Sequence, residues 1–202
     1  MISEKEFIEL VLEKSNSLEY FKNIDLTAKG EFKSEQSSVL VIIHFNHEYN
    51  PTVIFTKRSS NLRNHAGEIS FPGGRVSNQD SSIIETAIRE TYEEIGLSIQ
   101  KEKIFGSLAP TNTYTTKILI YPFIVILGKI SFPLEPNEEV EQVIEIPLEI
   151  LRDSMTIDED HSSRDNKMFK FNVDGYLIWG ATARILKNLS GPARVAVSPM
   201  AT

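Results

Sequence analysis

Three glutamates, Glu90, Glu93 and Glu94, occur close together near the middle of the chain. Residues three and four positions apart share one face of an α-helix, so a helix at this place brings the three carboxylates together. Like charges placed in this way repel each other, and a bound cation removes that penalty. The spacing therefore predicts a divalent-metal site, with a solvated acidic helix face as the alternative.

The residues around the glutamates predict the helix that must position them. Ser81 or Ser82 can cap its N-terminus by accepting a backbone N–H bond, and Gly96 can take the left-handed conformation that ends a helix. Apolar or small side chains recur at helical spacing on the other side and predict a buried face. These residues are Ile84, Ala87, Ile88, Thr91 and Ile95.

Arg89 extends the acidic cluster into a longer pattern. Its guanidinium is placed to pair across one helical turn with Glu93 or with Glu85. Together with Gly74, the run from Arg89 to Leu97 resembles the Nudix box, Gly-x5-Glu-x7-Arg-Glu-U-x-Glu-Glu-x-Gly-U, in which U is aliphatic. The second half of the pattern matches except at one position, where Thr91 replaces an aliphatic residue.

The first half of the box departs from the standard pattern. The spacing from Gly74 to Arg89 is one residue longer, and no glutamate stands at the expected place, where Asp80 is the nearest acid. This departure is typical of the coenzyme A branch of the family, which commonly tolerates the longer box with an aspartate at this position. The resemblance to that branch is therefore strengthened by the mismatch.

A segment upstream of the box resembles the additional signature of the same branch, Leu-Leu-Thr-x-Arg-Ser/Ala-x3-Arg-x3-Gly-x3-Phe-Pro-Gly-Gly. Ile54 and Phe55 replace the two leucines and keep these positions apolar. The positions that match the signature are Thr56, Arg58, Ser59, Arg63, Gly67, Phe71, Pro72, Gly73 and Gly74.

The resemblance implies the fold class α/β, with an α/β/α sandwich around a mixed β-sheet. It predicts an N-terminal helix and linker over residues 1–37 and a Nudix hydrolase domain over residues 38–202. Apolar runs predict strands and helices within this domain. The strands are expected at 39–43, 52–56, 104–108, 118–127, 143–148 and 168–173, a short helix at 148–153, an exposed loop at 158–167 and a last helix at 179–189.

A cluster of carboxylates without cysteine or paired histidine selects a hard cation, so we expect Mg²⁺ or Mn²⁺ rather than zinc. Carried over from the family, the ligands are Glu90, Glu93, Glu94 and the backbone carbonyl of Gly74. Arg89 is expected to orient Glu93. The family places the general base either inside the box or on a distal loop.

The general base therefore has two candidates, Glu93 inside the box and Glu139 in an acidic segment before an expected strand. A charged turn is the alternative interpretation of the Glu139 segment. Arg58 and Arg63 are assigned to substrate phosphates, which guanidinium groups bind in a bidentate way, and Gly73 and Gly74 complete the substrate site. Solubility is the alternative role of these two arginines.

The resemblance implies hydrolysis of coenzyme A or its acyl derivatives to 3′,5′-ADP and 4′-phosphopantetheine or its acylated form. Two alternatives stay open. One keeps the metal site and changes the substrate to a nucleoside triphosphate or another nucleoside diphosphate derivative. The other is a catalytically silent nucleotide-binding module, although the complete set of glutamates favours turnover. Many relatives are homodimers, but the sequence leaves the choice between monomer and homodimer open.

Composition limits the partners of the chain. With 202 residues and a formal net charge of −7, it suits one domain that binds a small phosphorylated molecule and not nucleic acid. Cysteine is absent, which excludes disulfides and thiol catalysis. The first residues, Met1–Glu6, lack a leader pattern, and the apolar run Ile118–Leu127 is too short to span a bilayer. We expect a cytoplasmic protein without a membrane partner.

Overall fold

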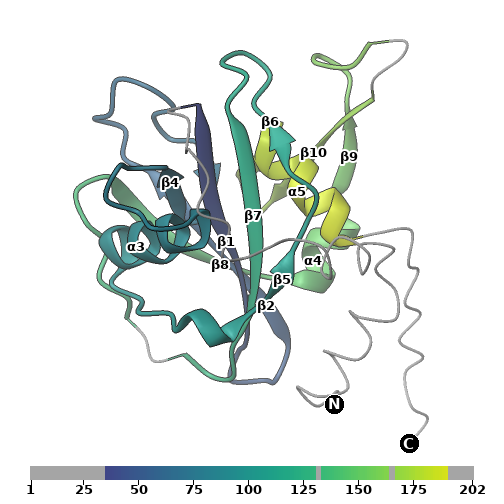
Figure 1. The fold of residues 1–202 in the computed structure, drawn as a ribbon. Coiled ribbons are helices and arrows are strands. Elements are labelled where there is room, and N and C mark those ends of the chain that lie inside the picture. Colours follow the sequence, from purple (N-terminus) through teal and green to yellow (C-terminus); the bar gives the residue numbers. More distant parts are fainter. Residues whose placement is uncertain (1–34, 131–132, 164–166, 191–202) are drawn as a thin grey trace, which may run out of the picture.

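The computed structural model describes residues 35–130, 133–163 and 167–190 of the chain. These residues form a large mixed sheet, a second small sheet and helices on both sides of the large sheet (Figure 1). The predicted α/β architecture with a mixed sheet is confirmed. The helix expected at residues 4–14 and the segment 195–202 lie outside the described residues, and the division between residues 37 and 38 stays a prediction.

The centre of the large sheet is β1 (Gln36–Phe45), which begins three residues before the predicted start of this strand. It pairs in parallel with β7 (Leu119–Ile126) and antiparallel with β2 (Pro51–Arg58). β5 (Ile104–Ser107) lies beyond β7, and β8 (Val140–Pro147) pairs with the outer edge of β2. All five long strands were predicted, with end positions that differ by a few residues.

Three short strands complete this sheet and were not predicted. β3 (Ile69–Ser70) pairs with the end of β2, and β4 (Gly73–Arg75) pairs with the start of β1. β6 (Thr111–Asn112) pairs with the start of β7. Segments of two or three residues are too short to show an alternating pattern, so their pairing follows from the longer strands beside them.

Both faces of β1 are buried, which divides the core into two layers. Leu40 and Ile42 face α3 (Ile83–Ile95), whereas Val41 and Ile43 face the opposite layer. That second layer contains α4 (Leu148–Asp153), α5 (Gly180–Ser190) and the small sheet. Figure 1 shows α3 on one side of the large sheet and α4 and α5 on the other. The two helices of the second layer were predicted.

The small sheet contains β9 (Met155–Asp158), β10 (Met168–Val173) and β11 (Tyr176–Ile178) in antiparallel order. β10 was predicted. The prediction of an exposed loop over residues 158–167 is wrong at its first residue, which belongs to β9. Asp158 is the last residue of β9 and is buried. It pairs with Met168 of β10, and its carboxylate hydrogen-bonds His161. No helix within the described ranges is long and apolar enough to cross a membrane.

The two ends of α3 form as the sequence predicts. Ser82 is the N-cap, and its hydroxyl accepts a hydrogen bond from the backbone N–H of Glu85. Gly96 ends the helix with a φ of 70°, the left-handed conformation that glycine adopts at little cost. The limits of the acidic helix are therefore determined by residues within the helix and next to it.

A buried aspartate fastens α3 to the loop before it. Asp80 accepts hydrogen bonds at 2.8 Å from Arg89 Nε, from Thr86 Oγ1 and from the backbone N–H of Ser77. Burial raises the pKa of the Asp80 carboxyl, but these hydrogen bonds and the Arg89 charge together hold the pKa below its ordinary value. Asp80 is therefore ionised in the folded protein and stabilises the position of α3.

Replacing Asp80 with asparagine tests this anchor. The variant keeps the shape of the side chain and loses its charge, so the free energy of unfolding at neutral pH should fall by about 2 kcal/mol. Because the folded-state pKa is lowered, the stabilisation is present above the unfolded-state pKa of about 3.9 and is lost as the pH falls through the folded-state pKa. The difference between wild type and variant should therefore shrink below about pH 4 in urea titrations.

Asp153→Asn is the matched control for this experiment. Asp153 is exposed at the end of α4, so its replacement should change the unfolding free energy by less than about 0.5 kcal/mol. A deficit of Asp80→Asn that stays the same at neutral and at low pH would contradict a stabilising role for the charge.

Candidate active site

Two glycines of β4 lie directly against the acidic face of α3. The backbone N–H of Gly73 donates to Glu94 Oε2 at 3.0 Å. A Cβ atom at Gly74 would lie only 2.4 Å from Cδ of Glu90, and a Cβ at Gly73 would lie 2.3 Å from the carbonyl oxygen of Ser38. Gly73 also has a φ of +141°. The φ of Gly73 and its contact with the backbone of β1 require glycine there, and glycine at position 74 lets β4 lie against the end of the Glu90 side chain.

Glu94 is an unusual carboxylate because its side chain is buried. The residue is 5% exposed, and burial raises the pKa of its carboxyl to about 7 even though the Gly73 N–H and the nearby Arg58 act in the opposite direction. Burial also raises the pKa of Glu90, against the effect of Arg89. Two carboxylates are thus held where water solvates them poorly, a setting in which a bound cation stabilises the charged form.

Arg89 binds three acidic side chains at once. In addition to Asp80, its guanidinium contacts Glu93 Oε2 and Glu90 Oε1, each at 2.9 Å. The predicted pairing with Glu93 is therefore confirmed. The alternative partner, Glu85, instead accepts hydrogen bonds from Ser81 at the start of the helix. Arg89 offsets the mutual repulsion of the carboxylates and fixes the rotamers of Glu90 and Glu93.

The chemistry of these side chains fits a hard divalent cation. All the predicted ligands offer oxygen atoms, and the missing Cβ of Gly74 lets the Glu90 carboxylate reach the backbone at that residue. The Gly74 carbonyl accepts a hydrogen bond from Ser37 Oγ at 2.6 Å, and Gly74 lies opposite Ser38 in the pairing of β4 with β1. Within the described residues no three acidic or histidine side chains converge at ligating distance, and Arg89 contacts both Glu90 and Glu93.

Arg58 and Glu139 meet beside this cluster although they are far apart in the sequence. They lie at the end of β2 and just before β8, and these strands pair with Arg58 opposite Val140. The backbone N–H of Ser59 donates to the Glu139 carbonyl at 2.8 Å, and Arg58 Nη2 lies 3.7 Å from Glu139 Oε2. Arg58 Nε is buried without a hydrogen-bond partner in the described part of the chain. The guanidinium is therefore incompletely satisfied.

The structure does not bring Arg63 into this group. Arg63 is exposed in the loop between β2 and β3, and its side chain makes no ion pair or hydrogen bond with another described residue. Two residues of the site were not predicted. Asp80 was noted in the sequence only as the nearest acid to the expected position, and nothing in the sequence indicates that the distant Ser37 contacts the Gly74 carbonyl.

Known proteins resemble this chain in both sequence and fold. "Uncharacterized Nudix hydrolase NudL" of Photorhabdus laumondii is 35% identical over 149 residues, which cover 72% of this chain and 79% of that protein. The NudL protein of Yersinia enterocolitica is 34% identical over 165 residues, covering 80% and 84%. A MutT/nudix family protein from Enterococcus faecalis shares the fold with a TM-score of 0.52 at 15% identity, over 95% of this chain and 73% of that one.

The NUDIX domain model matches residues 34–166. This range contains the whole acidic helix, the glycines of β4 and the loop that supplies Glu139. The chain therefore belongs to the Nudix family and is a hydrolase of that family's pyrophosphohydrolase type.

Proposed function

We propose that this Nudix hydrolase cleaves the diphosphate of coenzyme A and of its acyl derivatives. The products are 3′,5′-ADP and 4′-phosphopantetheine or its acylated form. The similarity to known proteins establishes the family but not the substrate. The substrate assignment therefore rests on the upstream signature of residues 54–74. One observation supports it most: Arg58 of that signature lies beside Glu94 and Glu139, with its guanidinium incompletely satisfied.

The proposal includes a Mg²⁺ or Mn²⁺ ion held by Glu90, Glu93, Glu94 and the carbonyl of Gly74. When bound, such an ion stabilises the negative charge that develops on the diphosphate oxygens during hydrolysis. Neighbouring groups of the protein hold the ligand side chains in place. Arg89 holds the Glu90 and Glu93 carboxylates, and the Gly73 N–H holds Glu94.

The remaining groups bind the substrate and move a proton. Arg58 binds a phosphate through its guanidinium, and Arg63 approaches a second phosphate from the exposed loop. Hydrolysis requires that the attacking water lose a proton to a carboxylate. We assign this role to Glu139, because Glu93 already accepts a hydrogen bond from Arg89 at 2.9 Å, whereas the nearest cation to Glu139 is 3.7 Å away.

Replacing Glu94 with glutamine tests the substrate class and the acidic site together. We expect wild-type protein with Mg²⁺ or Mn²⁺ to release 3′,5′-ADP from coenzyme A, and the variant to lose at least about 100-fold in kcat. Chromatography of the products measures both. Glu85→Gln on the same helix is the matched control and should keep its activity, since the Glu85 carboxylate accepts hydrogen bonds from Ser81 at the helix start, away from the other glutamates. Turnover of nucleoside triphosphates but not of coenzyme A would refute the proposed substrate.

Arg63→Ala should raise KM for coenzyme A by about 10-fold to 100-fold, because it removes a charge-assisted hydrogen bond to phosphate. kcat should change much less if the contact is equally strong in the ground and transition states. Arg152→Ala, on the distant helix α4, serves as the control for the loss of one surface charge. An unchanged KM for coenzyme A in Arg63→Ala would eliminate the phosphate-binding role.

Glu139→Gln should lower kcat by about 100-fold or more, the effect expected for removal of a general base. Steady-state kinetics across a range of pH measures the loss and shows whether an ionisation disappears from the profile. The neighbouring Glu138→Gln makes the same change in charge in the same exposed segment and should leave kcat within about twofold. Full activity of Glu139→Gln with an unchanged pH profile would refute the role of Glu139 as the general base.

A further inference from the structure

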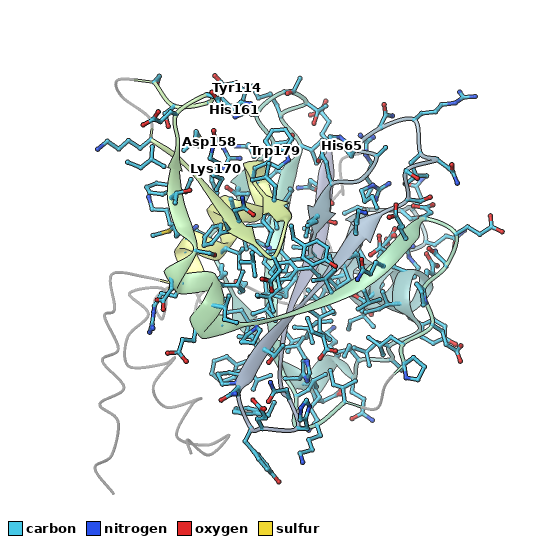
Figure 2. The ribbon with its side chains drawn as sticks, turned by 180° about the vertical axis from the view of Figure 1, so that it is seen from behind. His65, Tyr114, Asp158, His161, Lys170 and Trp179 are labelled. Carbon is cyan, nitrogen blue, oxygen red and sulfur yellow. The ribbon has the colours of Figure 1, made fainter. Side chains whose placement is uncertain are left out.

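A cavity of about 570 Å³ opens on the face of the large sheet that lies away from α3. Its walls come from the loop 66–69, from Gln142 of β8, from the turn between β10 and β11, and from Trp179. Figure 2, which shows the molecule from behind the view of Figure 1, labels Trp179 and the neighbouring His161. The volume lies within the range of small-molecule sites. None of the residues proposed for hydrolysis lines it.

Trp179 gives this cavity a flat aromatic wall. Its indole ring stacks on the imidazole of His161, with ring centroids 5.3 Å apart and an interplanar angle of 26°. His161 is held in turn by the buried Asp158, at 2.8 Å from its Nδ1. His161 itself does not line the cavity. Trp179 nevertheless stays 38% exposed, a surface on which another planar ring can stack.

Polar groups beside the indole supply one donor and one acceptor. The Tyr176 hydroxyl donates to Gln142 Oε1 at 3.2 Å, which fixes the amide and leaves its NH₂ group without a partner among the described residues. The Asp174 carboxylate likewise has no hydrogen bond or ion pair in the described part of the chain. Gly67 and Gly175 leave open space where a Cβ would stand. The donor and the acceptor both line the cavity, and a nucleobase carries complementary groups along its edge.

The charges of the lining disfavour a phosphate in this cavity. Lys57 is its only cationic residue among those described, and its ammonium group is already paired with Glu141 at 2.6 Å. Glu68 and Asp174 add negative charge. A neutral ring that carries hydrogen-bonding groups is therefore the better complement, whereas an anionic group would meet net repulsion.

The cavity and the acidic helix meet at the same end of β2. Consecutive side chains of a strand point to opposite faces, so Lys57 lines the cavity while the adjacent Arg58 faces Glu139. β3 likewise joins Ile69 of the cavity wall to the glycines of β4. One elongated ligand that passes over this end of the sheet can occupy both places.

We propose that the cavity binds the nucleobase of the substrate, stacked on Trp179 and contacted along its edge by Gln142 and Asp174, while the diphosphate lies at the acidic helix. This inference rests on the proposed function, since it assigns a place to the base of a nucleoside diphosphate derivative. Trp179 acts in binding and takes no part in the hydrolytic step.

The fluorescence of Trp179 tests the inference without turnover, because it is the only tryptophan in the sequence. Full-length protein in EDTA is titrated with 3′,5′-ADP and, separately, with 4′-phosphopantetheine. We expect saturable quenching by 3′,5′-ADP and none by 4′-phosphopantetheine. Quenching only by 4′-phosphopantetheine, or by neither compound, would overturn the assignment of the base.

Gln142→Leu tests the contact with the edge of the base and keeps the fluorescent residue. Loss of one neutral hydrogen bond should weaken the affinity for 3′,5′-ADP by about threefold to tenfold. Gln100→Leu, at an exposed position where the side chain makes no capping bond, is the matched control and should bind as the wild type does. Equal affinities of the two variants would refute the role of Gln142.

Steady-state kinetics distinguish this inference from the proposed function. Trp179→Ala should raise KM for coenzyme A about tenfold with kcat within about twofold, and Trp179→Phe should restore most of the affinity. Quenching by 3′,5′-ADP without any hydrolysis of coenzyme A would refute the substrate and keep the base site. Hydrolysis of coenzyme A with an unchanged KM in Trp179→Ala and no quenching would refute the base site and keep the substrate.

Discussion

The guanidinium of Arg89 lies between the carboxylates of Asp80, Glu90 and Glu93. Without a cation these groups would repel one another, and two of them are on the same short stretch of helix. The positive charge of Arg89 offsets this repulsion. Through Asp80, Arg89 also holds α3 against the loop that precedes it. The position of the whole acidic face relative to β4 depends on this one side chain, because a rotation of α3 would move Glu90 and Glu94 away from the glycines.

The approach of the backbone to the acidic helix is the second constraint. β4 is aligned by its pairing with β1, which sets Ser38 opposite Gly74. A Cβ on Gly73 would collide with the backbone of Ser38 in β1, and a Cβ on Gly74 would displace the carboxylate of Glu90 on α3. The same approach buries Glu94 and raises its pKa. Glycine at position 74 and the raised pKa of Glu94 therefore both occur where β4 meets the acidic helix.

The end of β2 connects two chemical environments. Arg58 and Glu139 belong to the face with the acidic helix, and Lys57 belongs to the opposite face with the cavity beside Trp179. The alternation of side chains along a strand produces this division. In the proposed complex, the charged diphosphate lies where carboxylates and arginines gather, and the neutral base lies where the cation is already paired.

The sequence alone determined the features that depend on nearby residues. The spacing of the glutamates, the caps at Ser82 and Gly96 and the long apolar strands follow from local periodicity and were predicted correctly. Only the tertiary structure decided the pairing of the short strands, the burial of Asp158, the contact of Arg58 with Glu139 and the cavity beside Trp179. Most of these features bring together residues that are far apart in the chain, and no local pattern records which segments will pair.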